Sequence, residues 1–325
     1  MTKKILVLAF FVFTSTVVYN QQLKKISFVL HWVPQAQFAG YYVAKDLGLY
    51  ENHGIDLTII PGGPKISTSE MLEEDRVDFA LMWLSNAIQL KSRGSKIVNI
   101  SQVVSRSSLM LIAKKSSGIK TPQDMNGKKI GVWGGDFQIQ PLAFFKKYNL
   151  KVNTIMQGSS INLFFFGGVD VTSAMWYNEY HTILNSGLNK DELNTFFFSD
   201  YGLNFPEEGI YCSEKFSKEN PKLCKDFVEA TLEGWKYAFE HPEDAIQIVQ
   251  KHMKMANLPT NKAHQRWMLA RMKDLISPSK NLDEFEMLSE QQYMLVAGKL
   301  KEEGLIKEIP SYKLFYQPVE LEIYK

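Results

Sequence analysis

Cysteine is scarce in this chain. Its 325 residues include only Cys212 and Cys224. No residues stand near them at the spacing that a metal site or an activated nucleophile needs, which argues against both kinds of cysteine chemistry. The two thiols either form a single bridge or stay free and buried, and the sequence leaves both states open because it does not place the Cα atoms.

A strong charge of either sign is also missing. The formal net charge is +2, and no run of lysine and arginine interleaved with aromatic residues occurs. We therefore expect no nucleic-acid partner. Internal repeats and low-complexity stretches are absent from the sequence as well. With 45% apolar and 22% charged residues, the composition is that of an ordinary globular protein, long enough for two domains.

The amino terminus differs from the rest of the chain. Lys3 and Lys4 precede an apolar run from 5 to 13, which is shorter than the roughly 20 residues that a membrane span requires. This layout predicts a signal peptide over residues 1–21 and export to the periplasm. The alternative is an apolar first strand, but two lysines followed by apolar residues without a turn are unusual for a strand. No cysteine stands near Asn20, so we expect no lipid anchor.

Strands and helices alternate along the chain. An apolar run at 26–30, a polar turn at Pro34 and Gln35, a helical pattern at 39–49 and a second apolar run at 55–60 predict one βαβ unit. Further strands are expected at 77–83, 97–104, 109–114, 129–133, 153–156, 169–174, 195–199 and 209–213, and helices at 67–76, 87–93, 136–148, 179–186, 261–275 and 284–303. The pattern predicts an α/β fold.

The first unit carries a family motif. Residues 31–50, HWVPQAQFAGYYVAKDLGLY, fit the pattern W-x-P-x5-G-x-Y-V-A-x3-G-x-Y. This resembles the opening of the family that contains thiamine-pyrimidine (hydroxymethylpyrimidine phosphate) synthase and ABC-transporter proteins that bind formylaminopyrimidine. The resemblance continues through GKKIGVWGG at 127–135.

The resemblance implies a two-lobed type II periplasmic-binding-protein fold with a ligand cleft between the lobes. Lobe 1 would comprise residues 22–113 and 211–325, and lobe 2 residues 114–210, with a hinge near Lys114 and at 209–213. The resemblance also implies an ABC permease as partner and a monomeric protein.

Loops that follow the strands are expected to meet in the cleft, where aromatic side chains beside a few polar groups suit a flat heteroaromatic solute. The ligand-binding candidates are His31, Trp32, Trp83, Asn86, Trp133, Trp176, Tyr177 and Glu179. Asn178 is a weaker candidate. The alternative is that several of the aromatic residues belong to the core and that Glu179 is a solvated helix-start residue. The Gly134–Gly135 loop resembles a phosphate cradle, although a plain turn is the favoured interpretation.

Synthases of the family use pyridoxal phosphate held by a lysine, a nearby histidine and a cysteine-rich motif associated with iron. Aligned on that motif, this chain has Met82 for the lysine and Asn86 for the histidine, and only Cys212 remains of the cysteines. A thioether forms no Schiff base and an amide does not titrate near neutrality. We therefore expect a binding protein for a pyrimidine such as formylaminopyrimidine or hydroxymethylpyrimidine, without cofactor or metal. The synthase, with pyridoxal phosphate and iron, is the alternative.

Overall fold

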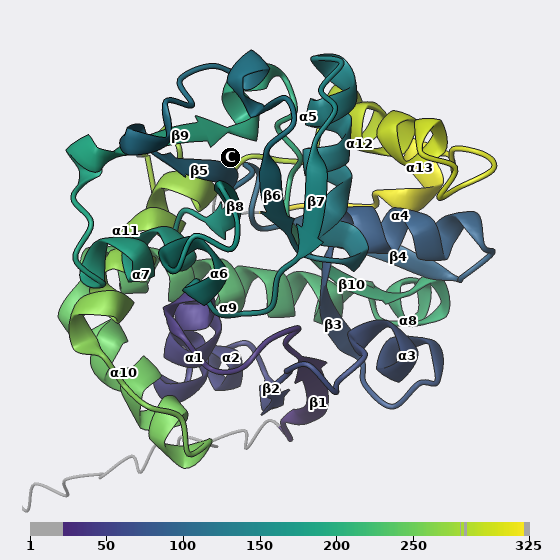
Figure 1. Ribbon diagram of the computed structural model, residues 1–325. Helices are drawn as coiled ribbons and strands as arrows, with labels where there is room; N and C mark the ends of the chain where they lie inside the picture. Colours follow the sequence, from purple (N-terminus) through teal and green to yellow (C-terminus); the bar gives the residue numbers. More distant parts are fainter. Residues whose placement is uncertain (1–21, 280, 283–284, 322–325) are drawn as a thin grey trace, which may run out of the picture.

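The computed structural model describes residues 22–279, 281–282 and 285–321 (Figure 1). The expected signal peptide, residues 1–21, lies outside the described residues. Within those residues, no helix is both long enough and apolar enough to cross a membrane.

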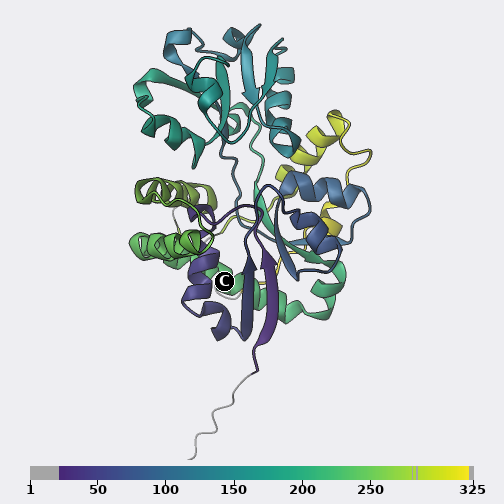
Figure 2. The ribbon, with the colours of Figure 1, turned by 60° about the horizontal axis from the view of Figure 1, so that its bottom comes forward.

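Two five-stranded sheets organise the molecule, and each sheet with its helices forms one lobe (Figure 2). The first sheet has the strand order β2 (Ile55–Ile60), β1 (Lys24–Val29), β3 (Phe79–Trp83), β10 (Glu208–Ser213) and β4 (Ile97–Gln102). Strand β1 pairs in parallel with β2 and β3, whereas β10 runs antiparallel to β3 and β4.

The second sheet repeats this arrangement with later strands. Its order is β7 (Asn153–Met156), β6 (Lys129–Val132), β8 (Val171–Met175), β5 (Leu109–Lys114) and β9 (Leu193–Phe197), with β5 as the antiparallel strand. The strand at 109–114, which we expected at the end of the first lobe, thus belongs to the second sheet. The strand is buried along almost its whole length, so its sequence has no pattern that indicates which sheet it joins.

The chain crosses between the sheets in residues 103–108 and returns in residues 198–207. The predicted position of the hinge, at Lys114 and 209–213, is therefore wrong, because those residues are paired within sheets. The two crossing segments are tied to each other: Glu207 N–H donates to Val104 O at 2.9 Å, and Ser107 N–H donates to Asn204 Oδ1 at 2.9 Å.

Helices surround both sheets. Those of the second lobe are α5 (Ile139–Lys147), α6 (Asn162–Phe165) and α7 (Glu179–Asn185). The remaining ones are α1 (Ala39–Asp46), α2 (Leu49–Asn52), α3 (Thr68–Glu73), α4 (Leu84–Ser92), α8 (Glu214–Glu219), α9 (Pro221–Glu240), α10 (Pro242–Met255), α11 (Lys262–Ile276), α12 (Glu290–Glu302) and α13 (Tyr312–Phe315).

Helix α9 is the main support of the first sheet. The Phe227 ring lies 5.2 Å from Phe28 of β1 and 4.2 Å from Phe79 of β3, measured between centroids. On another face, α9 crosses α1 at close range: a Cβ on Gly40 would lie 2.3 Å from the Trp235 ring. Only glycine at this position lets the indole fill the space between the two helices.

Several predicted elements are confirmed in place, and others differ. Strands β2, β5 and β7 have the predicted bounds. The helix expected over 39–49 instead ends at Asp46, because Gly48 adopts a left-handed φ of 73° and starts the separate α2. The helix expected from 284 begins only at Glu290, after a capping box formed by Ser289 and Gln292.

Both cysteines are buried free thiols. The hydrogen bond between them, together with burial, raises the pKa of the Cys212 thiol. The thiols are thus neighbours without a bridge.

Candidate functional site

A cavity of about 270 Å³ lies between the lobes at the ends of the parallel strands. The first lobe contributes residues that follow β1 and the side chain that ends β3. The second lobe contributes residues that follow β6, β7 and β8. The lining consists of His31, Trp32, Gln35, Gln37, Trp83, Trp133, Phe137, Gly158, Ser159, Met175, Tyr177, Asn178 and Glu179. Carboxyl ends of parallel strands are where open α/β sheets bind ligands.

Six of the eight predicted binding residues line this one cavity: His31, Trp32, Trp83, Trp133, Tyr177 and Glu179. Their contact with a ligand stays a prediction. The weaker candidate Asn178 lies there too.

Trp176 and Asn86 are not among the lining residues. Tyr177 occupies the cavity side of its turn, so its neighbour Trp176 faces away and packs edge-on against Phe197 at 5.6 Å. The Arg271 guanidinium covers the Trp176 ring at 4.7 Å. Asn86 lies in the first turn of α4, which starts directly after Trp83 and leads away from the cavity.

Aromatic rings form one side of the cavity. Trp83 of the first lobe meets Phe137 of the second edge-to-face at 5.1 Å, and Phe137 lies 5.9 Å from Trp133. The Trp133 indole is fixed by donating to Gly158 O at 3.0 Å. The Trp83 Nε1 is buried and has no hydrogen-bond partner. A buried N–H without a partner is unfavourable, so a ligand acceptor placed there would be stabilising.

A polar network borders the aromatic side of the cavity, where the His31 ring lies 5.9 Å from the Trp83 ring, and His31 is the one member of the network that we predicted. His31 Nε2 lies 2.8 Å from Glu208 Oε1. The Gln37 side-chain amide also donates to Glu208, and the Gln35 amide donates to Gln37 Oε1 at 2.5 Å. Glu208 is only 1% exposed, and its Oε2 has no hydrogen-bond partner. The network fixes the orientation of His31 and of the loop that carries the two glutamines.

Two acidic groups near the cavity have strongly shifted pKa values. Burial raises the pKa of Glu179 to about 7, against the opposing effect of hydrogen bonds from Met175 N–H at 3.0 Å and Asn178 Nδ2 at 2.8 Å. Burial, aided by the nearby Glu208 charge, raises the pKa of Glu207 to about 8. Burial also raises the pKa of Tyr177, with further contributions from Glu207, Glu208 and Glu179 in that order. Of these carboxyl groups, Glu179 lines the cavity, and Glu207 and Glu208 are buried near Tyr177.

Among the residues that the structure describes, neither a lysine nor an arginine lines the cavity. The Gly134–Gly135 loop leads into a four-residue 3-10 helix, 135–138, before α5 starts. The cavity therefore suits a flat ligand with amino groups that donate to carboxylates and amide oxygens, rather than a phosphate or sulfonate.

Sequence reasoning missed Gln37 and the Glu207–Glu208 pair, whereas Gln35 and Phe137 lie in loops expected at the cleft but were not named as binding residues. One signal was available: two acidic residues directly precede the apolar run at 209–212, so burial of a carboxyl group could have been expected. Their partners lie about 100 and 177 residues away, and no local pattern marks such pairings.

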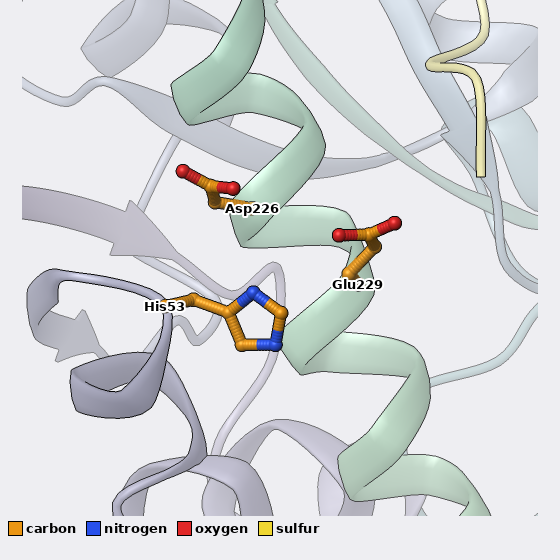
Figure 3. Close-up of side chains that lie close together, drawn as sticks. All are labelled: His53, Asp226 and Glu229. Atoms are coloured by element: carbon orange, nitrogen blue, oxygen red, sulfur yellow. The ribbon is translucent and has the colours of Figure 1, made fainter. Parts of the chain in front are cut away.

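A second group of side chains could bind a metal ion by its chemistry (Figure 3). His53, Asp226 and Glu229 each place one ligand atom within 4.8 Å of the others. His53 already lies 3.0 Å from Glu233, and Lys222 donates to both Asp226 oxygens at 2.8 and 2.7 Å. This group lies at the amino end of β2, whereas the cavity lies at the carboxyl end of the parallel β1. It takes no part in the cavity.

The family model described as NMT1/THI5 like matches residues 35–245. This chain belongs to the NMT1/THI5-like family. Among its relatives are both enzymes and binding proteins. A 4-amino-5-hydroxymethyl-2-methylpyrimidine phosphate synthase of Legionella pneumophila is 25% identical and covers 69% of this chain and 72% of its own. A formylaminopyrimidine-binding protein of Halalkalibacterium halodurans is 23% identical and covers 76% of each chain.

Solved structures agree on the fold. The periplasmic aliphatic sulphonate binding protein SsuA from Escherichia coli matches with a TM-score of 0.68 at 17% identity, over 92% of this chain and 94% of its own. The NMT1/THI5-like chain thus has the periplasmic-binding-protein fold that the resemblance implied.

The synthase relatives raise the question of pyridoxal phosphate, and the cavity of this NMT1/THI5-like protein does not fit that cofactor. No lysine lines it. Met82, at the position of the family lysine, is 1% exposed within β3. The described lining thus offers no amine that could hold the cofactor covalently, and no cysteine that could bind iron.

Proposed function

We propose that this protein is the solute-binding component of an ABC importer and binds a small pyrimidine that carries an amino group. Formylaminopyrimidine and hydroxymethylpyrimidine are the first ligands to test. One observation carries the proposal: the cavity combines aromatic walls from both lobes with the carboxyl group of Glu179 and has no cationic lysine or arginine.

The groups of the cavity match such a ligand. Trp32, Trp83 and Trp133 offer ring faces and edges to a flat heterocycle, each good aromatic pair contributing roughly 0.5 to 1.5 kcal/mol beyond the burial of area. Glu179 can accept a hydrogen bond from an exocyclic amine, and the Trp83 N–H can donate to a ring nitrogen. The formylaminopyrimidine-binding relative supports this assignment.

Ligand binding would favour the closed arrangement of the lobes. The two crossing segments, 103–108 and 198–207, are the only covalent links between the sheets in the described chain, so a hinge there would move the lobes as bodies. Since the cavity draws residues from both lobes, a ligand makes its full set of contacts only when they are together. That difference in contacts would shift the equilibrium toward closure.

Export is part of the proposal. Residues 1–21 have the layout of a signal peptide without a lipid-anchor cysteine, and SsuA, which shares the fold, is periplasmic by its description. The mature protein would deliver its ligand to a permease in the membrane.

The test is a tryptophan-fluorescence titration of residues 22–325 with formylaminopyrimidine, hydroxymethylpyrimidine, riboflavin, nitrate and taurine. We expect saturable quenching at micromolar or lower concentrations of a pyrimidine. Tight binding of nitrate or taurine in its place would overturn the ligand assignment. A covalent adduct after incubation with pyridoxal phosphate and reduction with borohydride would instead support the synthase.

A further inference from the structure

Helix α11 contacts the walls of the cavity from both lobes. Toward the first lobe, Gln265 Oε1 accepts a hydrogen bond of 2.7 Å from Ala36 N–H, which fixes the short helix that presents Gln37. Toward the second lobe, His264 Nε2 lies 2.9 Å from Asn178 Oδ1. Two adjacent residues of one helix thus each hold a polar segment of a different wall.

The hydrogen bond between Asn178 and His264 has a defined direction. Asn178 Nδ2 donates to Glu179 Oε1 at 2.8 Å, so its Oδ1 is the acceptor that faces His264. His264 therefore donates to Asn178 from Nε2. The other ring nitrogen, His264 Nδ1, lies 2.9 Å from His181 Nδ1, which also lies 3.1 Å from Asn185 Nδ2.

Stacked rings support the contact. The His181 ring stacks on the Trp267 indole at 4.9 Å with an interplanar angle of 11°, and Trp267 Nε1 donates to Trp176 O at 2.9 Å. The Arg271 guanidinium lies 4.7 Å from the Trp176 ring and 4.8 Å from the Trp267 ring. The connection between α11 and the second lobe is thus a packed cluster in which His264 is the residue that reaches the cavity wall.

We propose that His264 is a positioning residue that acts across the two lobes, holding Asn178 and through it the Glu179 carboxyl in the orientation that receives the ligand. The inference rests on the proposed function in one respect, namely that Glu179 contacts the ligand. It assigns a role in binding to a helix that contributes no residue to the cavity lining.

The surroundings of His264 keep it neutral. Burial, followed by the influence of His181, lowers its pKa from 6.5 to about 4, and burial lowers the pKa of His181. The cations near the cluster are Arg271 and Lys190, whose Nζ lies 5.4 Å from the Trp267 ring.

The other charged groups of α11 and α10 nearby are internally paired: Glu243 binds Arg266 at 2.6 Å and Lys262 at 3.0 Å. On the side of α7, the charged group is the Glu179 carboxyl, which Asn178 separates from His264. Because the pKa of His264 is lowered from 6.5 to about 4, the histidine stays mainly neutral in the folded protein until the pH falls close to 4, and the stability that the neutral group contributes declines between pH 6.5 and pH 4.

The test compares His264→Ala and His264→Gln with wild type, using 4-amino-5-hydroxymethyl-2-methylpyrimidine as the probe in calorimetric titrations at pH 7.5. A glutamine side chain keeps an N–H donor for Asn178 but does not titrate. We expect His264→Ala to weaken binding about tenfold at pH 7.5, with an unchanged melting temperature. We expect His264→Gln to stay near wild type. His53→Gln, at the far end of the first sheet, is the matched control.

Equal affinity of His264→Ala and wild type would overturn the inference, and so would a glutamine variant as weak as the alanine variant. Nitrogen-detected imidazole NMR of the ligand-free protein gives a separate readout: the inference requires the Nε2–H tautomer of His264 and a shift of the Asn178 side-chain amide signals in His264→Ala. Absence of probe binding by wild type would count against the proposed function, whereas the wrong tautomer would count against the role of His264.

Discussion

Glu207 and Ser108 join the two segments that cross between the lobes. One Glu207 oxygen accepts hydrogen bonds from both the Ser108 N–H, at 2.5 Å, and the Ser108 hydroxyl, at 2.9 Å. The other oxygen is buried without a partner. The carboxyl group is therefore held at the hinge in an environment that favours its protonated form.

This arrangement predicts a stability that falls with rising pH. Because the folded-state pKa of Glu207 is raised from 4.5 to about 8, the folded protein keeps a proton that the unfolded chain loses. The contribution of the neutral group is fully present below pH 4.5 and is lost as the pH rises to about 8. In Glu207→Gln, thermal unfolding between pH 5 and 9 should show a weaker decline than in wild type. If the melting temperatures of the two proteins change with pH in parallel, this prediction is contradicted.

Replacement of Trp32 separates binding from folding. Trp32 lines the cavity and is only partly buried. Trp32→Ala should weaken pyrimidine binding by at least about tenfold, since an aromatic face is lost, while the melting temperature stays close to that of wild type. Phe166→Ala, at a side chain that is 85% exposed, is the control. A large drop in melting temperature would show that Trp32 is a core residue.

Ligand binding should depend on the ionisation of Glu179. With a pKa raised to about 7, the carboxyl group is partly protonated at neutral pH. An amine of the ligand donates to the ionised form, so affinity should rise with pH and level off above about 7. Glu179→Gln should bind more weakly and without this dependence. Calorimetry between pH 6 and 8.5 measures both, and an unchanged pH profile in the variant would assign the dependence to another group.

The close contact of α1 with α9 can be tested with two glycines. Gly40→Ala would place a Cβ 2.3 Å from the Trp235 ring and should destabilise the fold by about 1–3 kcal/mol or more. Gly298→Ala in α12 has open space and should be neutral or stabilising by up to about 1 kcal/mol. Urea unfolding of both variants gives the comparison. Equal stability of the two variants would mean that α1 and α9 move apart without a loss of folding free energy.

The sequence predicted the alternation of strands and helices well, because apolar runs bounded by turn residues mark buried strands. It did not predict which sheet receives the strand at 109–114, since that depends on pairing with residues 58 to 87 positions later in the chain. Likewise, the sequence suggested both Trp176 and Tyr177 as binding residues, although of the two only Tyr177 lines the cavity. Which of two adjacent aromatic residues points inward depends on the register of the preceding strand. Glu208 was missed because its partners His31 and Gln37 lie 177 and 171 residues earlier in the chain.

The position of β10 between β3 and β4 has a consequence for how the molecule forms. Within the described residues, the strand that joins β4 to the first sheet is β10, which follows it by more than 100 residues, and the bridge from Asn99 to Tyr316 comes later still in the chain. The second sheet, by contrast, is built from the uninterrupted segment 109–197. A chain emerging from its amino end can therefore complete the second lobe while β4 still lacks its partner. Because contacts between distant residues form slowly, closure of the first sheet should be the late step. Until β10 forms, β4 cannot join β2, β1 and β3, so the first lobe is the later of the two to close.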